Sequence, residues 1–200
     1  MEETVRGIVL TLLAVALYGA LHSLLASLWA KRLAQRALGE AAGSGYRLAY
    51  NLIAVLTLLP VLAVPALDPG PLVYRIPWPW ALLTLAGQAV ALAALAIGLL
   101  QTDAWHFLGL RQLAASETEL PRIVVTGLYR WVRHPLYTAG LAFIWLAPVM
   151  TTSLLALNLA LTAYIYIGSR LEEHRLTHEF GEAYLAYARQ TPRLIPRPPR

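Results

Sequence analysis

Residues 136–169 read LYTAGLAFIWLAPVMTTSLLALNLALTAYIYIGS, an apolar block of 34 residues without a charged side chain. As one helix it would be about 51 Å long at ~1.5 Å per residue, which exceeds the ~30 Å hydrocarbon core of a bilayer. The segment 148–153, PVMTTS, begins with a proline and predicts a break in the helix. The block therefore predicts a hairpin of two helices that crosses a membrane twice.

Three further apolar runs lie upstream, at 5–29, 48–67 and 81–100. Each reaches the ~20 residues that a transmembrane helix requires. Charged residues make up 14% of the chain, whereas an average soluble domain has about 25%. The composition excludes an ordinary soluble domain and predicts an all-α, polytopic integral membrane protein. We expect one membrane domain over 1–200, with three spans in 1–100 and the hairpin, the polar tail and the candidate chemistry in 101–200.

Basic residues are concentrated in three segments, because 14 of the 16 Lys and Arg fall in 31–47, 101–134 and 170–200. These segments share one side of a membrane only if the hairpin crosses twice. The positive-inside rule then predicts five spans, a cytoplasmic C-terminus and, for a bacterial chain, the inner membrane. A four-span alternative would export the most basic segment.

The segment after the last span predicts an amphipathic cytoplasmic helix over 171–189, because apolar side chains recur there every three or four residues. Four prolines in 191–200 predict an extended tail beyond it.

Polar side chains gather in two stretches, 126–137 and 170–193, which the hairpin brings to the same membrane face. Arginines can bind a carboxylate, carboxylates an ammonium or sulfonium group, and tyrosine rings can stack on an adenine. The chain has no cysteine, no G-x-S-x-G or H-E-x-x-H motif and no glycine-rich loop after a strand, so thiolate, serine-hydrolase, zinc-protease and Rossmann chemistry are excluded. His174 and His178 have a metal-ligand spacing but lack a third ligand, and we predict no metal site.

Two purely structural readings of these residues stay open. Arg133 can be a positive-inside anchor, and Glu172 and Glu173 can pair with Arg170 or Arg175 at a solvated helix end.

Three motifs in this region resemble the integral-membrane methyltransferases: GLYRWVRHPLY at 127–137, EEHRLTHEFGEAY at 172–184 and PRLIP at 192–196. That superfamily includes the isoprenylcysteine carboxyl methyltransferases and the phospholipid N-methyltransferases, which use S-adenosylmethionine. The flanking segments HFLGLRQ at 106–112, WLAPVMT at 145–151 and LHSLL at 21–25 are similar to the methanethiol S-methyltransferases and their NnrU-like relatives.

The resemblance implies an S-adenosylmethionine-dependent methyltransferase. Its cofactor site would comprise Tyr129, His134, Pro135, Tyr137, Glu172, Glu173, Tyr184, Tyr187 and Arg193. His134 is the expected catalytic base for a thiol, with Arg133 as electrostatic help. The expected partners are membrane lipids and a small or lipophilic acceptor rather than nucleic acid.

The acceptor itself stays open, with a thiol first and an isoprenylated carboxylate or a phospholipid amine as alternatives. Two other classes of protein are compatible with the sequence: an NADPH-dependent sterol-type reductase and a non-enzymatic, NnrU-like membrane subunit.

Overall fold

The computed structural model describes residues 2–102 and 123–199, with side chains for all of these except 2–4 and 40–44. The predicted motif at 106–112 lies outside the described residues. The chain divides into two compact units. Unit 1 holds the described parts of Met1–Val73 and Thr151–Ala160, and unit 2 those of Tyr74–Thr102, Leu120–Met150 and Leu161–Arg200.

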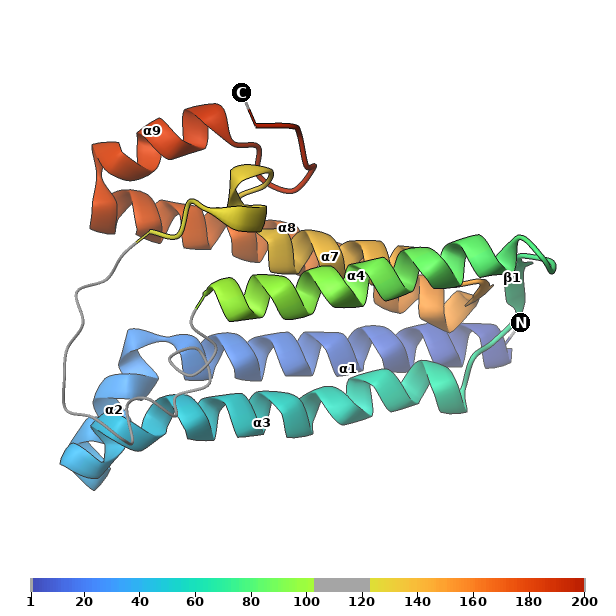
Figure 1. Cartoon of the computed structure of the whole chain (residues 1–200). Coiled ribbons are helices and arrows are strands. Elements are labelled where there is room, and N and C mark those ends of the chain that lie inside the picture. The colour runs from blue at the N-terminus through green and yellow to red at the C-terminus, as the bar shows by residue number, and fades with distance from the viewer. Residues whose placement is uncertain (1, 103–122, 200) are drawn as a thin grey trace. The chain divides into compact units, whose positions relative to one another are not determined.

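Unit 1 is built from α1 (Glu2–Ala26), α2 (Leu28–Leu38), α3 (Glu40–Leu67) and the first residues of α8. The predicted first span, 5–29, is three residues too long, because the chain bends at Ser27 and its side chain caps the next helix at the Ala30 amide. α1 lies along α3 (Figure 1). Near one end of this pair, Tyr50 Oη lies 2.6 Å from His22 Nε2, and Tyr46 donates to the Leu25 carbonyl at 2.5 Å.

Unit 2 contains α4 (Ala81–Gln101), η1 (Gly127–Arg130), α7 (Pro135–Trp145), most of α8 (Thr152–Phe180) and α9 (Glu182–Gln190). The short strands β1 (Leu72–Arg75) and β2 (Val149–Thr151) pair with each other. β2 occupies the predicted break at 148–153, so the prediction of two helices in place of one long helix is confirmed. That both helices cross a membrane stays a prediction. The helix predicted over 171–189 is instead interrupted at Gly181, whose φ of 55° ends α8 and allows α9 to turn back.

α7 has only 11 residues, about 16 Å, or half of a hydrocarbon core. The chain around it nevertheless runs the length of α4. At one end the Leu128 amide donates to Gln101 Oε1 at 3.0 Å, and at the other the Ile76 amide, just before α4, donates to the Pro148 carbonyl at 2.8 Å. Between these ends, Gln88 donates to the Phe143 carbonyl at 2.9 Å. A fifth crossing by η1, α7 and their flanking residues stays a prediction, because α7 alone is shorter than the helices that can span a membrane.

Four helices are long and apolar enough to span a membrane: Val5–Ala26, Gly45–Leu67, Ala81–Gln101 and Thr152–Phe180. At most 22% of the most apolar window of any of them is buried within the protein. Large apolar side chains such as Leu17, Leu56 and Val90 are exposed along them, which would be unfavourable in water and is favourable in lipid. The protein is an all-α, multi-pass membrane protein.

Candidate functional site

A buried carboxylate organises the polar end of unit 2. Glu173, in α8, is 8% exposed and binds two guanidinium groups. Its Oε1 accepts from Arg133 Nε at 2.7 Å, and its Oε2 accepts from Arg193 at 2.8 Å from Nε and 2.6 Å from Nη2. His134 Nε2 lies 3.2 Å from Oε1. We call Glu173, Arg133, His134 and Arg193 the Glu173 cluster; it joins α8, the residues before α7 and the C-terminal tail.

Arg133 also holds the end of α9 in place. Its Nη1 donates to the carbonyls of Ala188 and Thr191, at 2.8 and 2.5 Å. Helix C-termini have unpaired carbonyls and a partial negative charge, so a guanidinium group stabilises them. Arg133 therefore binds two negatively polarised groups at once, the Glu173 carboxylate and the end of α9. A lysine could not bind both in the same geometry, because it lacks the planar, forked guanidinium group.

The C-terminal tail, residues 191–199, binds back onto the segment that leads into α7. Four hydrogen bonds attach it: Arg133 N to Pro192 O, His134 N to Arg193 O, Thr138 Oγ1 to Leu194 O, and Arg197 N to Trp131 O. These bonds are 2.8 to 3.2 Å long. The tail is not uniformly extended as predicted, since bends occur at 191 and 193–195. Its attachment brings Arg193 within reach of Glu173.

His134 lies directly before Pro135, which begins α7. The imidazole is buried, stacks on the Tyr137 ring with centroids 5.2 Å apart, and has Nδ1 3.6 Å from Glu172 Oε2. Tyr137 donates to the same Glu172 oxygen at 2.9 Å. Burial lowers the pKa of His134 below its ordinary value, although the Glu172 charge opposes that shift. The ring is therefore neutral at pH 7.

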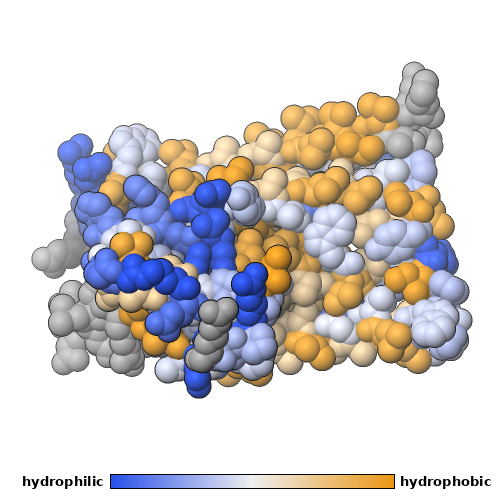
Figure 2. Space-filling model, turned by 90° about the horizontal axis from the view of Figure 1, so that it is seen from above, coloured by the Kyte–Doolittle hydropathy of each residue, from blue (hydrophilic) through white to orange (hydrophobic). Residues whose placement is uncertain are grey.

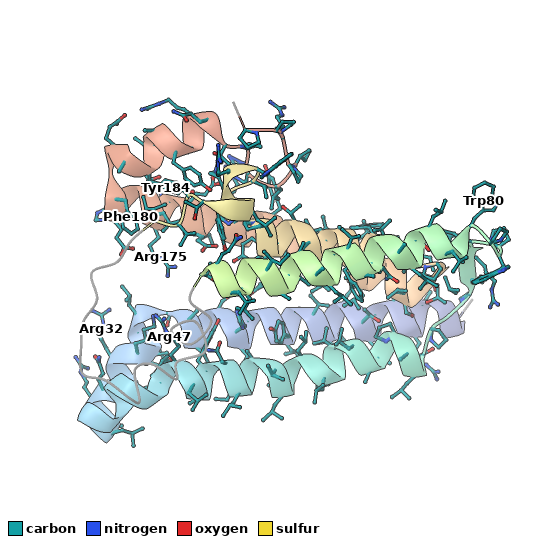
Figure 3. All side chains as sticks on the ribbon, in the orientation of Figure 1. Arg32, Arg47, Trp80, Arg175, Phe180 and Tyr184 are labelled. Carbon is teal, nitrogen blue, oxygen red and sulfur yellow. The ribbon has the colours of Figure 1, made fainter. Side chains whose placement is uncertain are left out.

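Three tyrosines lie beside the cluster. Tyr187 donates to the Tyr129 carbonyl at 2.7 Å, and its ring meets Tyr184 edge-on at 6.1 Å. Tyr184 projects from α9 into the space beside α8 (Figure 3) and is 3% exposed. Its hydroxyl is buried with no hydrogen-bond partner among the described residues. Because of burial, the pKa values of Tyr129 and Tyr184 are both raised to about 12, so each phenol stays protonated at neutral pH.

All ten residues that the sequence singles out lie in unit 2. The structure joins Arg133, His134 and Arg193 to Glu173, and Tyr137 to Glu172. The structural alternative in which Glu173 pairs with Arg170 or Arg175 is wrong, because its two carboxylate oxygens bind Arg133 and Arg193. The role of each residue toward a cofactor stays a prediction.

The sequence missed three groups that position the site. Thr138 and the carbonyl of Thr191 hold the tail, and Gln101 receives the Leu128 amide at the start of the segment. Only the Pro192 that follows Thr191 could have indicated a helix end there. Among the described residues, no three His, Cys, Asp or Glu side chains are grouped as metal ligands.

The hydropathy of the surface residues of unit 2 differs between its two ends. Figure 2 shows hydrophilic residues gathered at one end of this face, over α9 and the tail, whereas hydrophobic residues cover much of the rest. The buried Glu173 cluster thus lies at the polar end of an apolar helical unit.

Three relatives illustrate what the chain is similar to. It is 35% identical to a methanethiol S-methyltransferase from a Pseudomonas species over 72% of this chain and 56% of the relative. It is 34% identical to that of Crocosphaera subtropica over 58% of this chain and 50% of the relative. It is 32% identical to the human protein-S-isoprenylcysteine O-methyltransferase over 37% of this chain and 27% of the relative. No protein-family model matches the chain, and no solved structure matches it significantly.

These relatives define a class of membrane-embedded methyltransferases, which agrees with the apolar helices and the polar site of unit 2. The chain belongs to the family that includes the methanethiol S-methyltransferases and the isoprenylcysteine O-methyltransferases. It spans about half the length, or less, of the curated relatives that it matches.

Proposed function

We propose that this chain transfers a methyl group from S-adenosylmethionine to a small thiol such as methanethiol. The observation that carries the proposal is the Glu173 cluster, because residues that the family resemblance marks as cofactor-binding converge there from three segments of the chain. The thiol is preferred because several bacterial relatives are named methanethiol S-methyltransferases.

The groups at the site fit the chemistry of S-adenosylmethionine, which carries an ammonium, a carboxylate, a sulfonium and an adenosine. Glu172 is 35% exposed and, among the described residues, uses only Oε2 for a hydrogen bond. Its other oxygen can accept from an ammonium or a ribose hydroxyl. The partnerless Tyr184 hydroxyl can donate to a ligand, and the partly exposed Arg193 can bind a carboxylate.

When bound, S-adenosylmethionine supplies an electrophilic methyl group on a positively charged sulfur. The attacking thiol must lose its proton, because a thiolate is the nucleophile. We assign proton uptake to His134 Nδ1. That atom is not needed for the contact with Glu173, and it faces Glu172 Oε2 at 3.6 Å, so the carboxylate would stabilise the imidazolium that forms. Arg133 holds Glu173 in position, and Glu173 in turn contacts the His134 imidazole.

Burial at the site serves the same reaction. Methyl transfer from a sulfonium to a thiolate removes charge, so alignment and exclusion of water matter more than stabilisation of new charge. The tail, α9 and the aromatic rings of Tyr184 and Tyr187 cover the cluster from the side of α9. We place this end at the cytoplasmic surface of a bacterial inner membrane, where a lipophilic acceptor enters from the bilayer.

The test is methylation by the purified full chain in lipid nanodiscs. We expect methanethiol and S-adenosylmethionine to give dimethyl sulfide, measured by gas chromatography. An isoprenylated cysteine and phosphatidylethanolamine serve as competing acceptors. Glu182→Gln is the matched control for Glu173→Gln, because Glu182 forms an exposed ion pair with Arg189 on α9. Loss of product in Glu173→Gln but not in Glu182→Gln would support the assignment, and methylation of only the other acceptors would refute the thiol.

A further inference from the structure

α2 connects two membrane spans within unit 1 and is strongly amphipathic. It begins just after α1 ends at Ala26, and α3 starts directly after Gly39, whose φ is 61° (Figure 1). Parts of α1 and α3, Val5–Ala26 and Gly45–Leu67, are both long and apolar enough to cross a membrane. A helix between the ends of two neighbouring spans lies at the boundary between hydrocarbon and water.

The two faces of α2 differ sharply in chemistry. At 100° per residue, Ala30, Leu33, Ala34 and Ala37 fall on one side of the helix. Lys31, Arg32 and Gln35 fall on the other side, and Trp29 and Arg36 lie next to each other, about 20° apart, at the boundary between the two sides. Trp29 and Leu33 are 60% and 50% exposed, so the protein does not cover this edge of the apolar face, whereas Ala30 is buried. Tryptophan beside aliphatic residues is the composition of helices that insert into the interface.

The polar face carries only positive charge. Residues Leu28–Leu38 include three basic side chains and no acidic one. Arg32 and Arg36 are exposed, and neither forms a hydrogen bond or ion pair with the described residues (Figure 3 labels Arg32). Their guanidinium groups are thus available to bidentate oxyanions such as phosphate esters.

We propose that α2 binds the headgroups of anionic phospholipids, with Leu33 in the acyl region, Trp29 at the boundary between acyl chains and headgroups, and Arg32 and Arg36 on the phosphates. Charge complementarity favours this occupant, because anionic leaflets attract basic residues. A second copy of the chain fits less well. An 11-residue helix with two large exposed side chains on or beside its apolar face falls far short of the ~1,200 Å² that stable dimers bury.

The test uses the full chain in non-ionic detergent and counts bound short-chain lipids by native mass spectrometry. We expect wild type to prefer phosphatidylglycerol to phosphatidylcholine. Each of Arg32→Gln and Arg36→Gln should lower that preference about fivefold. The matched control is Arg75→Gln, which removes one exposed arginine from β1 and should leave the preference unchanged.

Two results would overturn the proposal. One is an equal preference in wild type and in the double variant R32Q/R36Q, and the other is an equal loss in Arg75→Gln. A dimer that Trp29→Ala dissociates would assign the face to a second copy instead. The thermal midpoint of each variant without added lipid establishes that it is folded. Since lipid counting needs no turnover, the outcome is independent of whether the chain methylates a thiol.

Discussion

Neutralising Glu173 is the most informative perturbation of the site. Glu173→Gln keeps the shape of the side chain but leaves Arg133 and Arg193 facing an amide, with side chains that are only 11% and 26% exposed. Removing one partner of a buried ion pair costs about 3–5 kcal/mol. Arg133 retains two carbonyl acceptors and Arg193 is partly hydrated. We therefore expect Glu173→Gln to lower the free energy of unfolding by about 2–3 kcal/mol.

That loss should be visible as a lower thermal midpoint. At about 2–4 °C per kcal/mol for a chain of this size, Glu173→Gln should unfold about 4–12 °C below wild type in differential scanning fluorimetry. Glu182→Gln removes an exposed ion pair and should shift the midpoint by no more than about 2 °C. If the two variants are equally stable, the two arginines do not depend on Glu173, and the cluster as described is wrong.

Two further predictions concern the tyrosines and the histidine. Tyr184→Phe removes a buried hydroxyl without a partner, so it should preserve or raise the thermal midpoint, whereas Tyr187→Phe loses its bond to Tyr129 and should lower it by about 2–4 °C. If Tyr184 meets the ligand, its variant should bind S-adenosylhomocysteine about fivefold more weakly in titration calorimetry; unchanged affinity would remove Tyr184 from the site. Because burial lowers the pKa of His134 below its ordinary 6.5, the unfolded chain binds the proton at a higher pH than the folded chain, and the free energy of unfolding should fall as the pH drops through about 6.5 toward the lower pKa of the folded state. His134→Asn should show a shallower fall across that range, and an identical pH profile would contradict a buried neutral imidazole.

The lengths of the apolar runs were sufficient to predict the long helices α1, α3, α4 and α8, but not the short helix α2. The break at 148–153 followed from one proline and the bilayer thickness, and β2 lies there. The bend at Ser27 was not predicted, because an apolar run continues through it to Trp29 and only the side-chain cap on Ala30 reveals the turn. Gly181 was missed for a similar reason, since a glycine within an amphipathic pattern does not by itself specify a positive φ.

All four residues of the Glu173 cluster were singled out from the sequence, but the bonds between them were not predicted. Arg133 and Glu173 were both identified, yet nothing in their spacing of 40 residues indicates that they pair. That pairing depends on the turn between α7 and α8 and on the tail folding back through backbone hydrogen bonds to residues 131–134. The other tail contacts use backbone carbonyls, those of Thr191 and Leu194, as acceptors for Arg133 and Thr138, and backbone acceptors leave no trace in side-chain composition.

Calorimetric titration of the detergent-purified full chain with S-adenosylhomocysteine, beside NADPH, tests the central claim most directly. We expect micromolar binding of S-adenosylhomocysteine, no binding of NADPH, and a weaker response in Glu173→Gln than in Glu182→Gln. Binding of NADPH alone would favour a reductase. Binding of neither ligand by protein with a cooperative thermal transition would contradict a methyl-transfer site at the Glu173 cluster.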